Sequence, residues 1–280
     1  MPIITVPGTP DIELHYEDAG AGAPVVLVHG WPLSGRSWEG QVPALVAAGH
    51  RVVTYDRRGF GDSSQPWTGY DYDTFAADLD AILTELDLTG VTLIGFSMGG
   101  GELARYVGTY GQERVAKLVF ASAVTPYLWK SDDNPDGGVT PDLAAWFHDG
   151  ITDDRPKFLS EFLVSFFTSG SPSLLNKPKV SAEQIAYNLD IAEGASPKGT
   201  LDCTVAFATT DFRADLAKIT VPTLVIHGDS DTIVPFEVSG KRTHEAIASS
   251  ELVVIKDAPH GVTVSHREEW NAHVLAFLAK

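Results

Sequence analysis

Ser97 occupies the centre of a Gly-x-Ser-x-Gly pattern, GFSMG, at residues 95–99. The run Val91–Ile94 before it is apolar and mostly β-branched, which is typical of a strand buried on both faces. After Met98 the apolar residues recur at helical spacing, so the pattern predicts a strand, a sharp turn and a helix. Because glycine has no Cβ, the strand end and the helix start can pass close together while the serine hydroxyl stays exposed. This context suits a nucleophilic serine, with the amide of Met98 at the helix N-terminus receiving the oxyanion that forms on an ester.

Two loops far along the chain offer the general base and the acid that a nucleophilic serine needs. His260 lies in the loop DAPHG after the apolar run 251–255, and Asp231 follows the run TLVIH. The order nucleophile, acid, histidine is that of α/β-hydrolases. His260 Nε2 would take the proton of Ser97, and Asp231 would hold the Nδ1–H group and stabilise the imidazolium. Asp229 is the alternative acid. Asp231 is preferred because it lies further into the loop, where its carboxylate can turn inward.

The second oxyanion donor is expected in the loop HGWP, which follows the apolar strand Val25–Val28. The backbone amide of Trp31 is the candidate. Pro32 stiffens this loop because it fixes its own φ and biases the residue before it towards an extended conformation. Five other histidines fit structural or surface positions: His29, His227, His244, His266 and His273. The chain has no H-E-x-x-H pattern and no pair of C-x-x-C motifs, so we expect no metal site.

Apolar runs and helical stripes alternate along most of the chain, which predicts a mostly parallel sheet covered by helices on both faces. Buried strands are expected at 25–28, 51–56, 91–94, 115–122, 223–227 and 251–257, and residues 11–18 alternate like an antiparallel edge strand. Helices are expected at about 38–48, after Asp73 as the cap, from Met98, from Pro235 to about Ile247, and after a capping box of Ser265 and Glu268.

Residues 123–217 interrupt this alternation. Strand signals are few there, proline and glycine recur, and aromatic side chains cluster. A segment with many apolar side chains and no sheet of its own must bury them against something else. We therefore expect a helical lid, 123–217, inserted into an α/β core of residues 1–122 and 218–280, over the C-terminal edge of the sheet.

The charge balance narrows the choice of partners. Lys and Arg number 20 and Asp and Glu 37, and the formal charge of −17 argues against nucleic acid and an anionic membrane, since both require a basic face. No stretch reaches the ~18 apolar residues of a membrane span. The single cysteine, Cys203, cannot form an intrachain disulfide, and the start lacks a basic leader region. We expect a cytoplasmic protein, and its oligomeric state, monomer or homo-oligomer, stays open.

Six motifs together carry a family resemblance that covers nearly the whole chain and is strongest outside residues 127–200. They are HGWP at 29–32, YDRRGFGDSS at 55–64, GFSMGG at 95–100, ASAVTP at 121–126, HGDSDTIVPFE at 227–237 and DAPHG at 257–261. With them the chain resembles the cofactor-free haloperoxidases and aryl esterases, a branch of the α/β-hydrolase fold. The resemblance implies a triad of Ser97, Asp231 and His260 and an oxyanion donor in the amide of Trp31.

The same resemblance implies a reaction with peroxide. Members with proline after that tryptophan, as at Pro32, resemble perhydrolases, which convert a carboxylic acid or ester and hydrogen peroxide into a peracid. The peracid then oxidises halide off the enzyme, so neither haem nor vanadium is required and no cofactor is expected.

An apolar pocket is expected between the lid and the loop after Asp231. The candidate lining residues, beside Pro32, are Val124, Leu128, Trp146, Phe162, Phe166, Ile233 and Val234. Such a pocket favours small acyl or aryl esters, cleaved through an acyl-serine, over long lipids and charged peptides. A lactonase or amidase acting on small cyclic substrates, and a ligand receptor without turnover, remain alternatives on the same fold. A dehalogenase or epoxide hydrolase is disfavoured, because those reactions need a carboxylate where this chain has Ser97.

Overall fold

A computed structural model of the chain describes residues 2–173 and 175–280. Its sheet has eight strands in the order β1-β2-β4-β3-β5-β6-β7-β8. Their bounds are β1 Ile3–Val6, β2 Ile12–Gly20, β3 Ala23–Val28, β4 His50–Tyr55, β5 Val91–Phe96, β6 Val115–Ala121, β7 Thr223–Gly228 and β8 Ser250–Ile255. β2 pairs antiparallel with β1 and β4, whereas β4, β3, β5, β6, β7 and β8 pair in parallel. The α/β fold with a mostly parallel sheet is confirmed.

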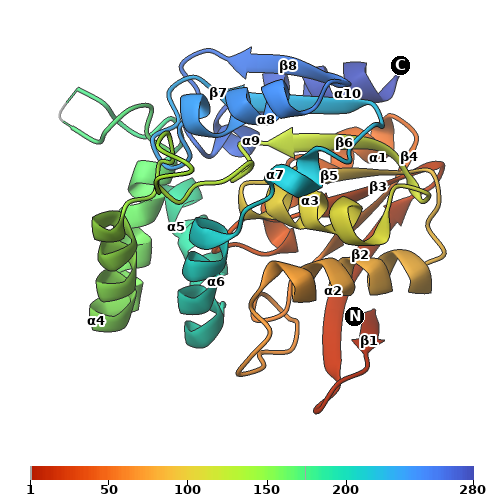
Figure 1. Cartoon of the computed structure of the whole chain (residues 1–280), viewed down its shortest axis with the longest axis horizontal. Helices are drawn as coiled ribbons and strands as arrows, with labels where there is room; N and C mark the ends of the chain where they lie inside the picture. Colours follow the sequence, from red (N-terminus) through yellow and green to blue (C-terminus); the bar gives the residue numbers. More distant parts are fainter. Residues whose placement is uncertain (1, 174) are drawn as a thin grey trace.

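Helices lie on both faces of this sheet (Figure 1). Outside the lid they are η1 Gly35–Trp38, α1 Val42–Ala47, α2 Tyr72–Glu85, α3 Met98–Tyr110, α7 Arg213–Leu216, η2 Phe236–Val238, α8 Gly240–Ala246, α9 Val262–Ser265 and α10 Arg267–Leu278. α2, α3, α7 and α8 pack in succession on one face, and α1 contacts β4 while α10 contacts β7 and β8. The central strands are buried because their residues are mostly apolar: every residue of Val25–Val28 and of Val91–Phe96 is buried, and the first run is wholly and the second largely apolar. None of the helices in the described ranges is long and apolar enough to cross a bilayer.

Between β6 and β7 the chain leaves the sheet and forms a helical insertion of α4 (Pro141–Phe166), α5 (Ala182–Glu193) and α6 (Pro197–Thr209), called the lid below. The three helices lie together beyond the sheet edge where β5 ends (Figure 1). α4 is kinked at Asp154, whose φ of −154° and ψ of 81° are not helical. Pro156 explains the kink because its ring lacks an N–H and clashes with the preceding turn. The helical insertion is confirmed, while the boundaries 123 and 217 stay a prediction.

The antiparallel strand expected at residues 11–18 is present as β2, but its expected position at the edge of the sheet is wrong. β2 is flanked by β4 and by β1, a four-residue strand at the start of the chain. In β1, Ile4 is buried and Ile3 is exposed, so the alternation that defines a half-buried strand is present. The run is so short that its periodicity does not stand out in the sequence.

Several expected helix starts are displaced. α2 is capped by Asp71 and not by Asp73: Asp71 is extended and accepts a hydrogen bond from the Thr74 amide at 2.9 Å. The capping box at Ser265 is wrong as well, because Ser265 ends α9 and α10 has no side-chain cap. The helix expected at 38–48 is shorter, because η1 ends at Trp38 and α1 covers only Val42–Ala47. The helix expected from Pro235 consists of η2 and α8.

Candidate active site

Ser97 lies in a strained turn between β5 and α3. Its φ is 53° and its ψ is −117°, a backbone conformation that is costly for a residue with a side chain. The turn is held by three hydrogen bonds: the Ser97 amide donates to Ala121 O at 2.8 Å, and the amides of Gly100 and Val124 donate to Ser97 O at 3.0 and 3.2 Å. A Cβ at Gly99 would overlap the carbonyl oxygen of Val28. The Gly-x-Ser-x-Gly pattern is therefore required by this close approach.

His260 contacts both expected partners. Its Nε2 lies 2.9 Å from Ser97 Oγ, and its Nδ1 lies 2.7 Å from Asp231 Oδ2. All three side chains are buried. The imidazole is packed by two rings, Phe96 at 5.1 Å and Phe166 at 4.9 Å between centroids. The structure thus brings Ser97, His260 and Asp231 into one hydrogen-bonded chain, although 163 and 29 positions separate the bonded residues in the sequence.

Asp231 is surrounded by hydrogen-bond donors. Its Oδ1 accepts from the amides of Ile233 and Val234, both at 2.9 Å. Burial by itself would raise the pKa of the Asp231 carboxyl, but the charge of His260 and hydrogen bonds from His227 and His260 lower this pKa overall. The carboxylate is therefore ionised and able to stabilise an imidazolium.

The alternative acid, Asp229, faces another way. Its Oδ1 accepts hydrogen bonds from the Asp257 amide at 2.7 Å and from Ser230 Oγ at 2.8 Å. These bonds tie the loop after β7 to the loop after β8, so the carboxylate of Asp229 acts as a connection between loops. The preference for Asp231 agrees with this geometry.

The loop after β3 presents the amide of Trp31. The Gly30 carbonyl oxygen, which belongs to the same peptide group, accepts hydrogen bonds from the Leu33 amide and from His29 Nδ1, each at 3.0 Å. Because the peptide is planar, fixing this oxygen also fixes the direction of the Trp31 N–H group on the opposite side. A Cβ at Gly30 would lie 3.0 Å from Ser97 Cβ, so this peptide group is close to Ser97.

The tautomer of His29 is set by its other nitrogen. His29 Nε2 accepts the Arg57 N–H group at 3.0 Å, so the proton must be on Nδ1, where it is donated to Gly30 O. Burial and the charge of Arg57 lower the pKa of His29, so the ring stays neutral. His29, which the sequence assigns to structural or surface roles, therefore orients the loop that carries Trp31.

A buried ion pair connects this loop to the helix of the nucleophile. Arg57 Nε donates to Glu102 Oε2 on α3 at 2.7 Å, and Arg57 Nη2 donates to the His29 carbonyl oxygen at 2.9 Å. Tyr55 Oη donates to the other carboxylate oxygen of Glu102. Both charged side chains are completely buried. The two expected oxyanion donors, Trp31 on the loop and Met98 at the start of α3, are thus joined through Arg57 and Glu102.

An apolar cavity of about 40 Å³, called the catalytic cavity below, opens at Ser97 and His260. The residues that line it, besides these two, are Trp31, Val124, Leu128, Val139, Leu143, Phe147, Phe162, Phe207, Ile233 and Val234. Five of the expected lining residues are among them: Val124, Leu128, Phe162, Ile233 and Val234. The lining contains no charged side chain besides the groups of the triad, so the cavity suits a small uncharged acyl group.

Three expected lining residues do not line the cavity. Trp146 is 51% exposed and packs on Phe147 and Phe158 instead. Phe166 lies behind the cavity, against His260, and Pro32 is buried in the loop after Trp31.

Four lining residues were missed, namely Val139, Leu143, Phe147 and Phe207. Phe147 and Phe207 belong to the aromatic cluster that the sequence displays. Which of two adjacent aromatic residues faces inward depends on the helical phase, and the kink at Asp154 breaks the phase of α4. The sequence carries no signal that identifies Phe147 in place of Trp146.

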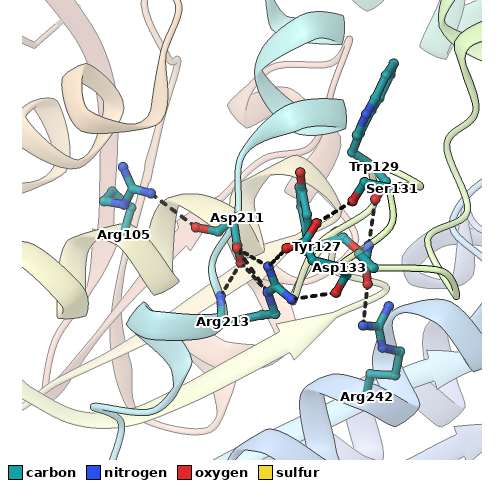
Figure 2. Close-up of polar contacts among 9 residues, drawn as sticks. Arg105, Tyr127, Trp129, Ser131, Asp133, Asp211, Arg213 and Arg242 are labelled. Carbon is teal, nitrogen blue, oxygen red and sulfur yellow. Dashed lines mark hydrogen bonds and ion pairs between the residues drawn. The ribbon is translucent and has the colours of Figure 1, made fainter.

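Charged contacts hold one wall of the cavity, the segment 127–139, which contributes Leu128 and Val139. Figure 2 shows Arg213 between Asp211 and Asp133, with Arg213 Nη2 at 2.7 Å from Asp133 Oδ2. The guanidinium of Arg213 also lies 5.1 Å from the centre of the Tyr127 ring. The adjacent residue of the segment, Asn134, is held from a different helix, because Arg242 Nη2 donates to Asn134 Oδ1 at 2.7 Å. The wall is thereby attached to α7 and α8.

One group of side chains within the described ranges has the spacing of metal ligands: His15, Asp56 and Asp62, whose candidate atoms lie within 4.8 Å of one another. The Asp56 carboxylate already accepts hydrogen bonds from the Gly35 amide at 2.7 Å and the Asp62 amide at 2.8 Å. Asp56 therefore stabilises the loops around it. Cys203 is buried, and burial raises the pKa of its thiol, so it is unsuited to act as a nucleophile.

Comparison with known proteins places this geometry in a family. Residues 23–266 match the family model described as the alpha/beta hydrolase fold. The chain is 49% identical to a putative non-heme chloroperoxidase of Synechocystis sp., over 99% of this chain and 100% of that protein. It is 37% identical to the bifunctional esterase/perhydrolase DCH of Acinetobacter calcoaceticus, over 95% and 96% of the two chains. The crystal structure of a bromoperoxidase from Bacillus anthracis superposes with a TM-score of 0.95 at 57% identity, over 100% of this chain and 99% of the other.

Proposed function

The chain belongs to the α/β-hydrolase fold family and is an enzyme of the non-heme chloroperoxidase and esterase/perhydrolase type. On this basis we propose that Ser97 forms an acyl-enzyme with small acyl or aryl esters. The observation that carries this assignment is the position of His260, 2.9 Å from Ser97 Oγ and 2.7 Å from Asp231 Oδ2. The cytoplasmic location remains a prediction.

Acylation follows from this geometry. His260 Nε2 removes the proton of Ser97 as Oγ attacks the ester carbonyl, and Asp231 stabilises the imidazolium that results. The negative charge on the former carbonyl oxygen is received by the amides of Met98 and Trp31. When the tetrahedral intermediate collapses, the C–O bond to the alcohol breaks, and His260 returns the proton to the leaving alkoxide. The acyl group then remains on Ser97 Oγ.

Deacylation decides between hydrolysis and perhydrolysis. His260 removes a proton from water or from hydrogen peroxide, and the oxygen attacks the acyl carbon. The bond between the acyl carbon and Ser97 Oγ then breaks, and His260 returns the proton to Ser97 Oγ. Water releases the carboxylic acid, and hydrogen peroxide releases the peracid. A peracid that leaves the site transfers one oxygen to a halide ion and becomes the carboxylic acid, which accounts for a haloperoxidase activity without a redox group on the protein.

We propose that Pro32 influences whether water or hydrogen peroxide attacks the acyl-enzyme. The proline ring removes an N–H group from the loop that presents Trp31 and constrains the Trp31 carbonyl, which can accept a hydrogen bond from peroxide. Comparing initial rates of peracid formation and ester hydrolysis for the wild-type protein and Pro32→Leu tests this role. We expect the ratio of the two rates to fall in the variant, and an unchanged ratio would remove Pro32 from the mechanism.

The catalytic cavity limits the acyl group. With a volume of about 40 Å³ between Phe147, Phe162 and Phe207, it accepts a short acyl chain without rearrangement. We therefore expect higher kcat/KM for p-nitrophenyl acetate than for long-chain esters. Ser97→Ala should abolish turnover of p-nitrophenyl acetate while the protein stays folded. Retention of this turnover would contradict the proposed mechanism.

A further inference from the structure

His227, at the end of β7, contacts the catalytic acid. Its side chain is fully buried, and Nε2 lies 2.8 Å from the Val234 carbonyl oxygen and 3.3 Å from Asp231 Oδ2. Both oxygens are acceptors, so Nε2 carries the hydrogen and shares it between them. The opposite nitrogen, Nδ1, has no hydrogen-bond partner among the described residues, and a Cβ at Gly240 would lie only 2.5 Å from it. The ring is thus confined to one orientation and one tautomer.

We propose that His227 is a positioning residue for the catalytic acid. Its single N–H group connects the two ends of the turn from Asp231 to Val234, so it holds the carboxylate in line with His260. The inference rests on the proposed function, because it assumes that Asp231 and His260 act together on Ser97.

The shared oxygen gives this contact an electrostatic consequence. Asp231 Oδ2 accepts both from His260 Nδ1 at 2.7 Å and from His227 Nε2 at 3.3 Å. The second donor disperses part of the negative charge and so reduces the attraction between the carboxylate and a protonated His260. Without His227 the charge is more localised on the oxygen that faces His260. The protonated form of His260 is then favoured, so in a variant without His227 the ability of His260 to accept a proton is lost at a higher pH than in the wild type.

Asp231 is the charged group that contacts both His227 and His260. His227 is met by Phe236 from η2, at 5.7 Å between ring centres, and by Gly240 from α8. His260 is met by Phe96 from β5 and Phe166 from α4, together with the Ser97 hydroxyl. Of these groups and Asp231, only Asp231 carries a charge.

The test compares His227→Leu, which removes the donor at similar volume, with His227→Gln, whose side-chain amide can place an N–H group near the same point. The measurement is kcat/KM for p-nitrophenyl acetate from pH 5 to 8, with active sites counted by an organophosphate. On the acidic side of this profile, called the acid limb below, kcat/KM falls as the pH is lowered. We expect His227→Leu to shift the acid limb to higher pH by roughly half a pH unit and to lower kcat roughly fivefold. His227→Gln should restore most of both. His15→Leu removes another buried histidine, distant in sequence from the triad, and should leave the position of the limb unchanged.

The outcomes separate the two proposals. If Ser97→Ala is inactive but the acid limb of His227→Leu coincides with that of the wild type, the role of His227 is refuted and the triad stands. If both His227 variants lose activity equally without a shift, the residue is only structural. Should His227→Leu fail to fold, Gly240→Ala replaces it, since the added methyl group displaces the ring from Asp231. An unshifted limb in that variant would also overturn the proposal. Turnover by Ser97→Ala would refute the proposed function itself.

Discussion

Glu102→Ala should be among the most damaging single substitutions outside the triad. It removes the carboxylate that accepts from Arg57 Nε and from Tyr55, and both members of the ion pair are completely buried. Arg57 would then keep one hydrogen bond, to the His29 carbonyl oxygen, and a charge without a counterion. Breaking a buried pair by removing one partner costs about 3–5 kcal/mol. Since the stability of a native protein is about 5–15 kcal/mol, the variant should be close to unfolding.

The double variant Arg57→Met/Glu102→Leu separates stability from catalysis. Replacing both charges by apolar side chains removes the unpaired cation, so the free energy of unfolding should recover to within about 1–2 kcal/mol of the wild type. The anchor on the His29 carbonyl oxygen is nevertheless lost, and the loop that presents the Trp31 amide is less constrained. Loss of one oxyanion donor lowers kcat by about 10²–10³, so a partial displacement should lower kcat by roughly tenfold with little change in KM.

Urea unfolding followed by tryptophan fluorescence, together with kcat and KM for p-nitrophenyl acetate, measures both effects. A double variant with recovered stability and wild-type kcat would show that Arg57 does not position the loop. A loss of less than about 1 kcal/mol in Glu102→Ala would show that the ion pair contributes little to stability.

Four further outcomes follow from the cavity and from the triad. Phe207→Ala should raise the butyrate-to-acetate ratio of kcat/KM for p-nitrophenyl esters several-fold, whereas Trp146→Ala, outside the cavity lining, should leave this ratio unchanged. Arg213→Ala releases the 127–139 wall, so it should raise KM more than it lowers kcat; the reverse pattern would argue against a wall function. The pKa of Asp231 is lowered in the folded state, so its contribution to stability is fully present above the unfolded value of about 3.9 and is lost as pH falls further. Activity requires neutral His260 and should therefore fall reversibly as the pH is lowered, while circular dichroism still reports folded protein.

The meeting of Ser97, Asp231 and His260 at one edge of the sheet could be predicted from the sequence, because each of these residues belongs to a local sequence pattern. A strained serine between a buried strand and a helix requires small residues around it. Gly99 is such a residue, because a side chain there would overlap the Val28 carbonyl oxygen. The acid and the histidine follow directly after β7 and β8, and parallel pairing of β5 to β8 brings these strand ends to one edge. Local chemistry and sheet topology thus agree at this edge.

The lid and the supporting contacts could not be predicted in the same way, because they depend on long-range packing. The kink at Asp154 breaks the helical period of α4, and the expected lining residue Trp146 accordingly lies outside the cavity, where the structure has Phe147. The contact between Glu102 and Arg57 joins residues 45 positions apart, and nothing in either neighbourhood indicates the other. Similarly, His227 resembles any buried strand histidine until the position of Asp231 is known.

Both oxyanion donors of the proposed mechanism are backbone amides, which explains why the supporting contacts matter as much as the triad. Replacing the side chain of Trp31 or Met98 leaves the N–H group in the chain, so no such substitution deletes a donor. Their positions depend instead on peptide planes, and the plane that contains the Trp31 amide is held by His29 at Gly30 O and by Arg57 at His29 O. The acid depends in the same way on His227 and on two amides of its own loop. The buried polar side chains near Ser97 therefore serve to orient backbone N–H groups, which every residue except proline carries.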